Sequence, residues 1–334
     1  MHAYELTILS AQAKTAALVR IALADNAITD DILFSIAALS YGPNNKLAEL
    51  AQGEPTLGLF DSPVKHLSLN GILSRGEFAP EHFEMLHMLV EARGGLKAVE
   101  LAGVAELLQY FDVLRASLEL RRPRFVLCQT NQLILDHHIA EARALIPRVE
   151  CCDANPDLES ILADMRVCCQ LIELHSTAKL DSKLVVILPQ VSVIMQHRIL
   201  SLPVGRDEVC RLATLIFSYG VTFPIMDPRP IKTLADQLRE ILKQPSQTKD
   251  HDKRTILWAT MLGAIASANT ELEQFFAWRI RLLSKTMKVY HWLSVKSMLR
   301  GFVWLDRACD QGGQTIWSKS VSQRKIIVAS VGLR

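Results

Sequence analysis

The sequence predicts an all-α protein, a single large domain in which helical hairpins stack around one core. Apolar residues make up 49% of the 334 residues, which is enough to bury a sizeable core. They recur at steps of three and four residues along nearly the whole chain, which is the helical period. Most prolines fall at the joints between these periodic segments, where helices stop. We find no fixed-period repeat and no low-complexity linker.

The first two helices are predicted from periodicity and from a capping signal. Apolar residues spaced three and four apart predict an amphipathic helix over residues 5–24. Thr29 or Asp30 is expected to cap a second helix that ends near Gly42. Residues 43–80 hold many turn formers, so we expect an irregular insertion there, unusually long for a compact domain.

The rest of the chain is predicted to be a series of helices. We expect them at residues 80–93, 97–119, 131–145, 157–178, 182–200, 206–220, 229–243, 252–269, 271–290 and 292–310. Pro189 lies inside one of them and should kink or split it. The longest strand-like run is 326–331 in the tail.

Charge is spread unevenly, although the net charge is only +2. Residues 275–334 hold eleven Lys and Arg but only two acids, Asp306 and Asp310, whereas residues 1–60 are acidic on balance. The favoured interpretation is that a basic C-terminal helix face contacts an acidic surface elsewhere in the fold. An acidic partner or nucleic acid is the alternative.

The chain is expected to be soluble and intracellular. Its N-terminus lacks the features of a signal peptide, and its most apolar runs, 184–195 and 212–226, are too short for a membrane span and contain proline. An odd count of seven cysteines favours reduced thiols. Cys151, Cys152, Cys168 and Cys169 could gather four thiolates around zinc, but buried apolar packing is the favoured interpretation.

Residues 82–96, HFEMLHMLVEARGGL, raise the question of a metal or acid–base site. On a helix, Glu84, His87 and Glu91 would share one polar stripe, which is common on solvated faces. Glycine adopts the left-handed backbone that ends many helices, so Gly94 and Gly95 predict a helix stop. We interpret the segment as structural, with Arg93 near the carbonyl end and Leu96 folding back.

Several stretches together resemble the fungal-specific transcription factor domain, the helical regulatory region downstream of fungal six-cysteine zinc clusters. The resemblance covers His82 with the RGGL of 93–96, AxxxAL at 13–18 with 30–40, DEVCRLATLIFSYGVTFP at 207–224 with 234–242, and the aromatic segments 256–280 and 291–317. Its motif residues are His82, Arg93, Gly94, Gly95, Leu96, Cys210, Arg211, Trp258, Trp292, Trp304 and Asp306.

The zinc cluster that contacts DNA in that family is missing from this sequence. Nothing like Cys-x-x-Cys-x6-Cys precedes the resembling region, so we expect no DNA-binding domain, which could reflect a truncated gene model. Residues 43–80 also look longer than the family's usual connection. The resemblance then implies a nuclear regulator (a cytoplasmic location being the alternative) that acts through protein partners, as a homodimer or a heterodimer with a zinc-cluster transcription factor.

Other clusters of functional residues receive structural interpretations. Helical geometry would separate His138 from His137 and Glu141, which argues against a metal site at 136–141. Asp30, Asp31 and Asp136 suggest an all-α enzyme of terpene-cyclase type, but the Asp-Asp-x-x-Asp motif is absent. No nucleophile elbow or phosphate loop occurs. Residues 121–124 and 249–254 are short basic segments, interpreted as solvated loops or a nuclear-import signal.

The aromatic residues of the last quarter are expected to form a packed core, which could also host a small apolar ligand. They are Trp258, Phe275, Phe276, Trp278, Trp292, Phe302, Trp304 and Trp317. Our leading hypothesis is a non-enzymatic regulatory domain that binds proteins and a small effector, with no catalytic, metal or DNA-binding residues and no cofactor. The alternatives are a helical scaffold without a ligand and an all-α enzyme.

Overall fold

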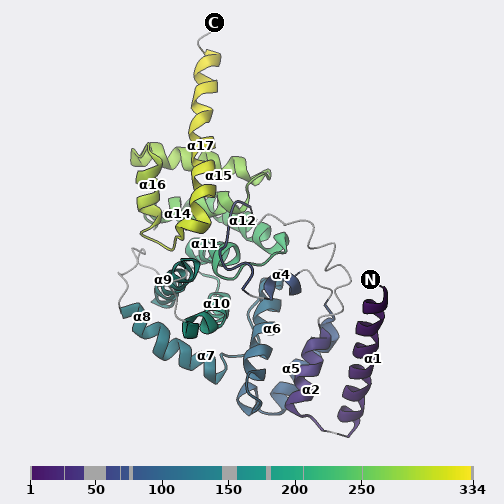
Figure 1. Cartoon of the computed structure of the whole chain (residues 1–334). Coiled ribbons are helices and arrows are strands. Elements are labelled where there is room, and N and C mark those ends of the chain that lie inside the picture. The colour runs from purple at the N-terminus through teal and green to yellow at the C-terminus, as the bar shows by residue number, and fades with distance from the viewer. Residues whose placement is uncertain are drawn as a thin grey trace.

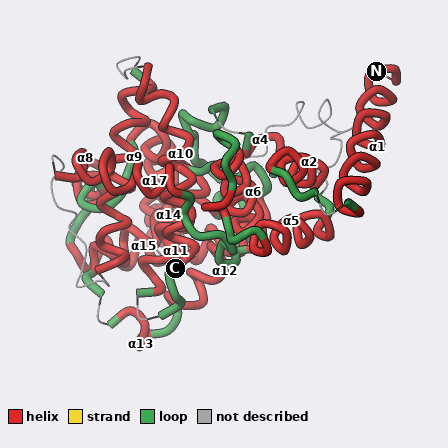
Figure 2. The backbone as a smooth tube through the Cα atoms, turned by 90° about the horizontal axis from the view of Figure 1, so that it is seen from below, coloured by secondary structure: helices red, strands yellow, loops and turns green. Residues whose placement is uncertain are grey.

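The computed structural model describes residues 2–25, 27–40, 58–67, 69–74, 78–144, 156–177, 182–205, 207–249 and 251–331, and in these ranges the backbone forms helices and loops without strands (Figures 1 and 2). The all-α prediction is therefore confirmed.

The α-helices are α1 His2–Ala24, α2 Asp30–Ser40, α4 Asn70–Leu73, α5 Pro80–Ala92, α6 Val104–Glu119, α7 Gln129–Leu133, α8 Ala140–Ala144, α9 Pro156–Ser176, α10 Ser182–Ser201, α11 Glu208–Phe217, α12 Pro228–Leu242, α13 Pro245–Thr248, α14 Lys253–Ala266, α15 Leu272–Met287, α16 Trp292–Leu299 and α17 Asp306–Val331. A 3₁₀ turn covers Leu96–Ala98, and π-helical turns cover Ile134–Ile139 and Ser218–Thr222. None of the helices in the described ranges is long and apolar enough to cross a membrane.

Helix α14 is the centre of the C-terminal half. Every residue from Thr255 to Ala266 is buried, so this helix presents no face to water. It packs against α11, α12, α15, α16 and α17. Gly263 allows the close approach of α15, because a Cβ there would lie 2.5 Å from the Phe276 ring.

The N-terminal helices α1, α2 and α5 lie at the opposite end of the molecule from α17 (Figure 1). Helix α2 packs against α5, and α1 packs against α2. The predicted stop after α5 is a Schellman motif: Gly95 N–H donates to Val90 O and Gly94 N–H to Glu91 O, both at 2.9 Å. Both glycines have positive φ, +104° for Gly94 and +85° for Gly95, as predicted.

Arg93 and Asp30 join the two helices of this unit. The Arg93 guanidinium pairs with Asp30 at 2.5 Å and donates to Ala98 O, beyond its own helix end. The Asp30 carboxylate also accepts the backbone N–H groups of Glu100 and Leu101 at 2.7 Å. Asp30 therefore does not cap α2 with its side chain, and the turn it holds delays α6 to Val104 rather than the predicted residue 97.

Part of the predicted insertion is built into the core. Leu59 N–H donates to Ile265 O of α14, and Asp61 N–H to Ala308 O of α17. The Ser62 hydroxyl donates to Val221 O at 2.7 Å, in the π-turn after α11. This short segment, residues 58–62, therefore joins three helical elements that are distant in sequence. Residues 43–57 lie outside the described residues.

Three other predicted elements differ from the structure. The helix predicted at 292–310 is split, because Phe302, Val303 and Trp304 are all buried in an intervening loop, and helical backbone would point some of them outward. The strand-like run 326–331 belongs to α17, whose C-terminal part extends beyond the body (Figure 1). Pro189 does not split its helix, since α10 is continuous from Ser182 to Ser201.

Candidate functional site

A cleft lies where the ends of α6 and α10 face α11 and α12. Its volume is about 530 Å³, within the range of small-molecule sites. The lining residues are Leu120, Arg121, Arg122, Leu200, Leu202, Val204, Glu208, Arg211, Leu215, Leu234, Asp236, Gln237, Glu240 and Ile241. Apolar and charged side chains therefore share one concave surface.

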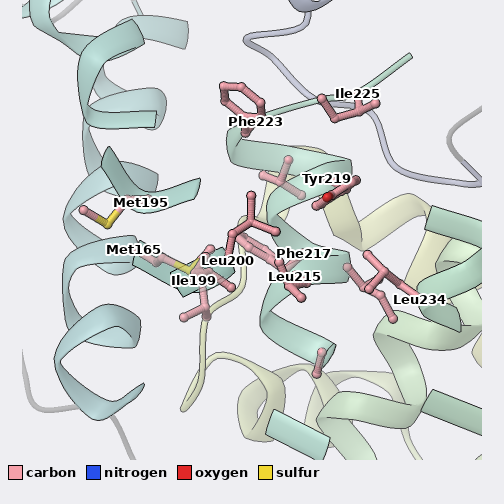
Figure 3. Packing of buried hydrophobic residues seen from close by; sticks show 14 of the residues in the cluster. Met165, Met195, Ile199, Leu200, Leu215, Phe217, Tyr219, Phe223, Ile225 and Leu234 are labelled. Carbon is pink, nitrogen blue, oxygen red and sulfur yellow. The ribbon is translucent and has the colours of Figure 1, made fainter. Parts of the chain in front are cut away.

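The floor of this cleft is apolar and fixed. Leu200, Leu215 and Leu234 are at most 5% exposed and come from α10, α11 and α12. Figure 3 shows these three side chains among the buried residues of the core. An apolar group entering the cleft would thus meet leucine side chains that the core already holds in place.

The α11 wall carries a shielded ion pair. The Arg211 guanidinium binds both carboxylate oxygens of Glu208, at 2.6 Å from Nε and 2.5 Å from Nη2. The exposed fractions of these side chains are only 13% and 9%. A bidentate pair in this setting satisfies both partners and keeps the wall polar without leaving a free charge.

The α12 wall is acidic but also paired. Asp236 contacts Arg239 at 2.6 Å, and Glu240 contacts Lys243 at 2.9 Å. The hydrogen bond from Lys243 lowers the pKa of Glu240, so its carboxylate is ionised at neutral pH.

Arg121 and Arg122 form the α6 side of the cleft and differ in their partners. Arg121 pairs with Glu119 at 2.6 Å and with the fully buried Asp112 at 3.4 Å. Arg122 is exposed, and its guanidinium makes no hydrogen bond or ion pair with any residue in the described ranges. Arg122 is therefore the lining cation that is free to receive an anionic group.

Buried polar residues of α6 hold the loop that carries these arginines. Asp112 accepts the N–H groups of Arg124 and Phe125, at 2.6 and 2.8 Å. Burial raises the pKa of Asp112, and these hydrogen bonds offset part of that rise. Gln109 donates to Val126 O at 2.7 Å and accepts from Cys128 N–H at 3.2 Å.

Contacts from outside α6 fix the same loop further. Arg124 forms a bidentate pair with Glu84, at 2.5 Å to each oxygen, and the Phe125 ring stacks on His87 with centroids 5.1 Å apart. His197 of α10 shares a hydrogen bond of 2.9 Å with Phe125 O. The basic segment 121–124 is thus a surface loop beside the cleft, as predicted, with Arg122 and Arg124 exposed and its backbone held in place by these contacts.

The predicted motif residues do not converge on one site. His82 contacts Leu39 O at 3.2 Å, and Arg93, Gly94, Gly95 and the buried Leu96 form the helix stop after α5. Cys210 is buried on α11, and Arg211 lines the cleft. The remaining motif residues, Trp258, Trp292, Trp304 and Asp306, lie in the C-terminal half.

The C-terminal aromatic core exists, with one exception. Trp258 stacks on Phe302 with centroids 5.2 Å apart and donates to Val303 O at 3.0 Å. Trp304 donates to Asp310 at 2.8 Å and lies near Trp292. Trp278 was expected in this core, but it is 52% exposed, because it lies on the solvent side of α15.

The described residues contain no group of three or more His, Cys, Asp or Glu side chains that could hold a metal ion. Asp136, His137, His138 and Glu141 are exposed around a π-helical turn, and Asp136 accepts hydrogen bonds from Gln132. Burial raises the pKa of the Cys168 thiol to about 12 and that of Cys169 well above its usual value, so both are neutral thiols. Cys151 and Cys152 lie outside the described residues.

Sequence reasoning missed the buried polar residues that hold the loop beside the cleft. Gln109 and Asp112 stand among the buried Leu108, Phe111 and Val113 of one helix. Polar side chains at core positions of a helix are the signal that could have found them, since burying such groups requires partners.

Comparisons of this chain with family models, with curated proteins and with solved structures give no match.

Proposed function

We propose that this chain is a non-enzymatic, helical regulatory domain of the transcription-regulator type, which binds a small effector in the cleft and acts through protein partners in the nucleus. The observation that carries the proposal is the cleft of about 530 Å³ with its apolar floor and charged rim. The resemblance of several stretches of the sequence to the fungal-specific transcription factor domain supports the regulatory part. The protein would reach DNA through a partner.

The lining chemistry favours an effector with an apolar body and one acidic group. Leu200, Leu215 and Leu234 offer an apolar surface, while Arg122 offers an unpaired guanidinium at the rim. Guanidinium groups bind carboxylates through two parallel hydrogen bonds, which orient the ligand. A carboxylic acid with an aliphatic or aromatic body fits both features.

Effector binding would act by favouring one helical packing over another. The cleft walls come from four different elements, so a ligand that contacts all of them stabilises one relative arrangement. Helices α11 and α12 pack directly on α14, the central helix of the C-terminal half. A change at the cleft can therefore reach that half through packed helices.

The partners of the buried acids favour binding over catalysis. Asp164 is fully buried and paired with both Arg143 and Arg198, and Asp112 is occupied by the loop beside the cleft. Burial raises the pKa of Asp164 as it does that of Asp112. Perturbed carboxylates often mark catalytic sites, but here each supports a structural connection.

The first test is transcriptional. The full chain fused to a heterologous DNA-binding domain should change the output of a reporter that carries the matching operator. The unfused chain should not shift genomic DNA in a gel at moderate salt. DNA binding by the unfused chain, or a fusion with no effect on the reporter, would contradict the regulatory proposal.

The second test addresses the cleft by calorimetry with a panel of aliphatic and aryl carboxylic acids. Val204→Trp should block binding, because Val204 lines the cleft and is 75% exposed, so the larger side chain can fill the space without disturbing the core. Val126→Trp is the matched control, since Val126 is 76% exposed and does not line the cleft. Arg122→Gln should weaken binding of the acids, whereas Arg20→Gln on α1 should not. Equal loss in test and control variants would exclude the cleft as the site.

A further inference from the structure

The basic C-terminal region finds acidic partners for only part of its charge. Among its described side chains, four cations form ion pairs: Lys296 with Asp306 and Asp310, Arg300 with Asp306, Arg307 with Glu173, and Lys319 with Glu273. The predicted contact with acids elsewhere in the fold is therefore confirmed for Arg307 and Lys319. The other cations of this region whose side chains the structure describes cluster on one helix.

That helix is α15. Arg279, Arg281, Lys285 and the C-cap residue Lys288 have no acidic partner among the described residues. The inner face of α15 is buried through Phe276, Ala277, Ile280 and Ser284. The outer face is expected to be polar throughout, as on other surface helices.

The outer face of α15 is instead both basic and apolar. Trp278, Arg281, Leu282 and Lys285 stand at i, i+3, i+4 and i+7, which places them on one stripe of the helix. We refer to these four residues as the α15 face. Trp278 is 52% exposed and Leu282 is 47% exposed. Exposed large apolar side chains grouped with unpaired cations are characteristic of a binding surface rather than of a solvated one.

We propose that the α15 face binds an acidic amphipathic segment of a partner protein, one in which Asp or Glu alternates with large apolar side chains. Acidic residues of such a segment would complement Arg281 and Lys285, and its apolar residues would cover Trp278 and Leu282. Tryptophan and arginine are the residues most enriched among those that dominate binding energy at protein interfaces. Charge complementarity adds specificity and speeds association.

A protein segment fits this face better than a nucleic acid does. Tryptophan can stack on a base, but the aliphatic Leu282 side chain gains most from an apolar side chain of a protein. Nucleic-acid binding of useful strength also gathers many phosphate contacts, for example 6–10 in typical DNA complexes. The α15 face itself offers two cations, Arg281 and Lys285, and Arg279 and Lys288 lie beside them. These are fewer cations than such a set of phosphate contacts requires.

This inference goes beyond the proposed effector cleft and is independent of it. The α15 face lies on a different helix from those that line the cleft. A chain that failed the reporter and calorimetry tests would still bind the peptide if the present inference holds. Likewise, a chain that failed to bind the peptide would still bind the effector if the cleft is its site.

The test uses the full chain and a fluorescein-labelled synthetic peptide of about fifteen residues that alternates Glu or Asp with Leu and Phe. Fluorescence anisotropy should show saturable binding that weakens as salt is raised, because the ionic part is screened. Trp278→Ser and the double variant Arg281→Glu/Lys285→Glu should each weaken binding about tenfold or more, the loss typical of a dominant interface residue. Trp278 and Lys285 are exposed and Arg281 is half-buried, and none of the three belongs to the buried face of α15, so folding should be retained, as circular dichroism can verify.

Matched controls distinguish binding at the α15 face from non-specific binding of the peptide. Met88→Ser/Lys97→Glu removes an exposed apolar residue and an exposed lysine near α5, and it should leave binding unchanged. A peptide with Gln and Asn in place of its acids, and polyglutamate of equal charge, should both bind at least tenfold more weakly.

Three outcomes would overturn the proposal. The first is no saturable binding of the acidic amphipathic peptide, or equal loss in the control variant. The second is tighter binding of a single-stranded oligonucleotide of equal charge than of the peptide, which would identify a nucleic acid as the ligand. The third is dimerisation in sedimentation equilibrium that Arg281→Glu/Lys285→Glu abolishes, which would identify a second copy of this chain as the occupant.

Discussion

Replacement of Gly95 by alanine tests whether the RGGL segment ends a helix by backbone conformation alone. Gly95 has φ +85° and ψ −175°, a region that only glycine adopts without strain. A Cβ built there has nothing within 4 Å, so no steric clash contributes. The cost of Gly95→Ala is therefore backbone strain, about 2 kcal/mol.

Alanine also restricts the unfolded chain, which stabilises the folded state by about 0.4–1 kcal/mol. Gly205→Ala measures this term by itself, because Gly205 also has nothing within 4 Å of an added Cβ and its φ is not in the left-handed region. The two variants should thus differ by about 2 kcal/mol. For 334 residues at about 2.1 cal/mol/K each, the unfolding entropy is about 0.7 kcal/mol/K. The difference then corresponds to about 3 °C in Tm.

The assay is urea unfolding followed by circular dichroism and by fluorescence, with thermal melts of the same variants. Coincident transitions by the two probes would justify a two-state analysis. Gly95→Ala should have a lower urea midpoint than the parent chain, and Gly205→Ala an equal or higher one. Equal midpoints for the two variants would refute the argument that strain at Gly95 sets the end of α5.

Three further predictions follow from buried groups. Asp112→Ala should lower the free energy of unfolding by about 3 kcal/mol, because it leaves the Arg124 and Phe125 N–H groups without their acceptor. Asp112→Asn retains an acceptor and should lose only about 1 kcal/mol. Urea unfolding measures both losses. Burial lowers the pKa of His197 from its usual 6.5, so below that pH the unfolded chain binds more protons than the folded chain. The free energy of unfolding should therefore fall as the pH drops below about 6.5. His197→Gln should show a flatter pH dependence of this free energy. Gly220→Ala places a Cβ 2.4 Å from the Phe60 ring, so it should lower the free energy of unfolding by about 1–3 kcal/mol, as thermal melts can measure. The double variant Gly220→Ala/Phe60→Leu should recover part of this stability if the 58–62 segment packs against Gly220.

The local rules of helix formation account for most of what the sequence predicted correctly. Periodicity placed the helices to within a few residues in most cases, and the glycine pair after α5 predicted a specific backbone conformation. These features depend on residues close together in the chain. The stop at Gly94 and Gly95, for example, is completed by hydrogen bonds to Val90 and Glu91 of the same helix.

The errors arose where distant residues decide the local structure. The predicted helix 97–119 begins late, because the carboxylate of Asp30, about seventy residues earlier, takes the N–H groups of Glu100 and Leu101. The predicted helix 292–310 is interrupted, because Trp258 binds Val303 O and stacks on Phe302. No periodicity within either segment contains this information.

The cleft could not be predicted for the same reason. Its lining comes from the ends of α6 and α10 and from the sides of α11 and α12, and a cleft exists only where such elements fail to fill the space between them. Arg121 and Arg122 are adjacent in the sequence and have the same side chain. Arg121 is paired with Asp112 and Glu119, whereas Arg122 has no such partner in the part of the chain that the structure describes. The assignment of a free cation thus required the tertiary structure.

The two proposed sites are separate surfaces that share a structural connection. Helix α12 supplies Leu234, Asp236 and Glu240 to the cleft and also packs against both α14 and α15. An effector that shifts α12 would move one of the supports of the α15 face. Thermodynamic linkage then requires that the partner peptide and the effector change each other's affinity by the same factor. A factor of one would mean that α12 is held too rigidly by α14 to transmit the shift, whereas a larger factor would make this helix the element through which a ligand controls partner binding.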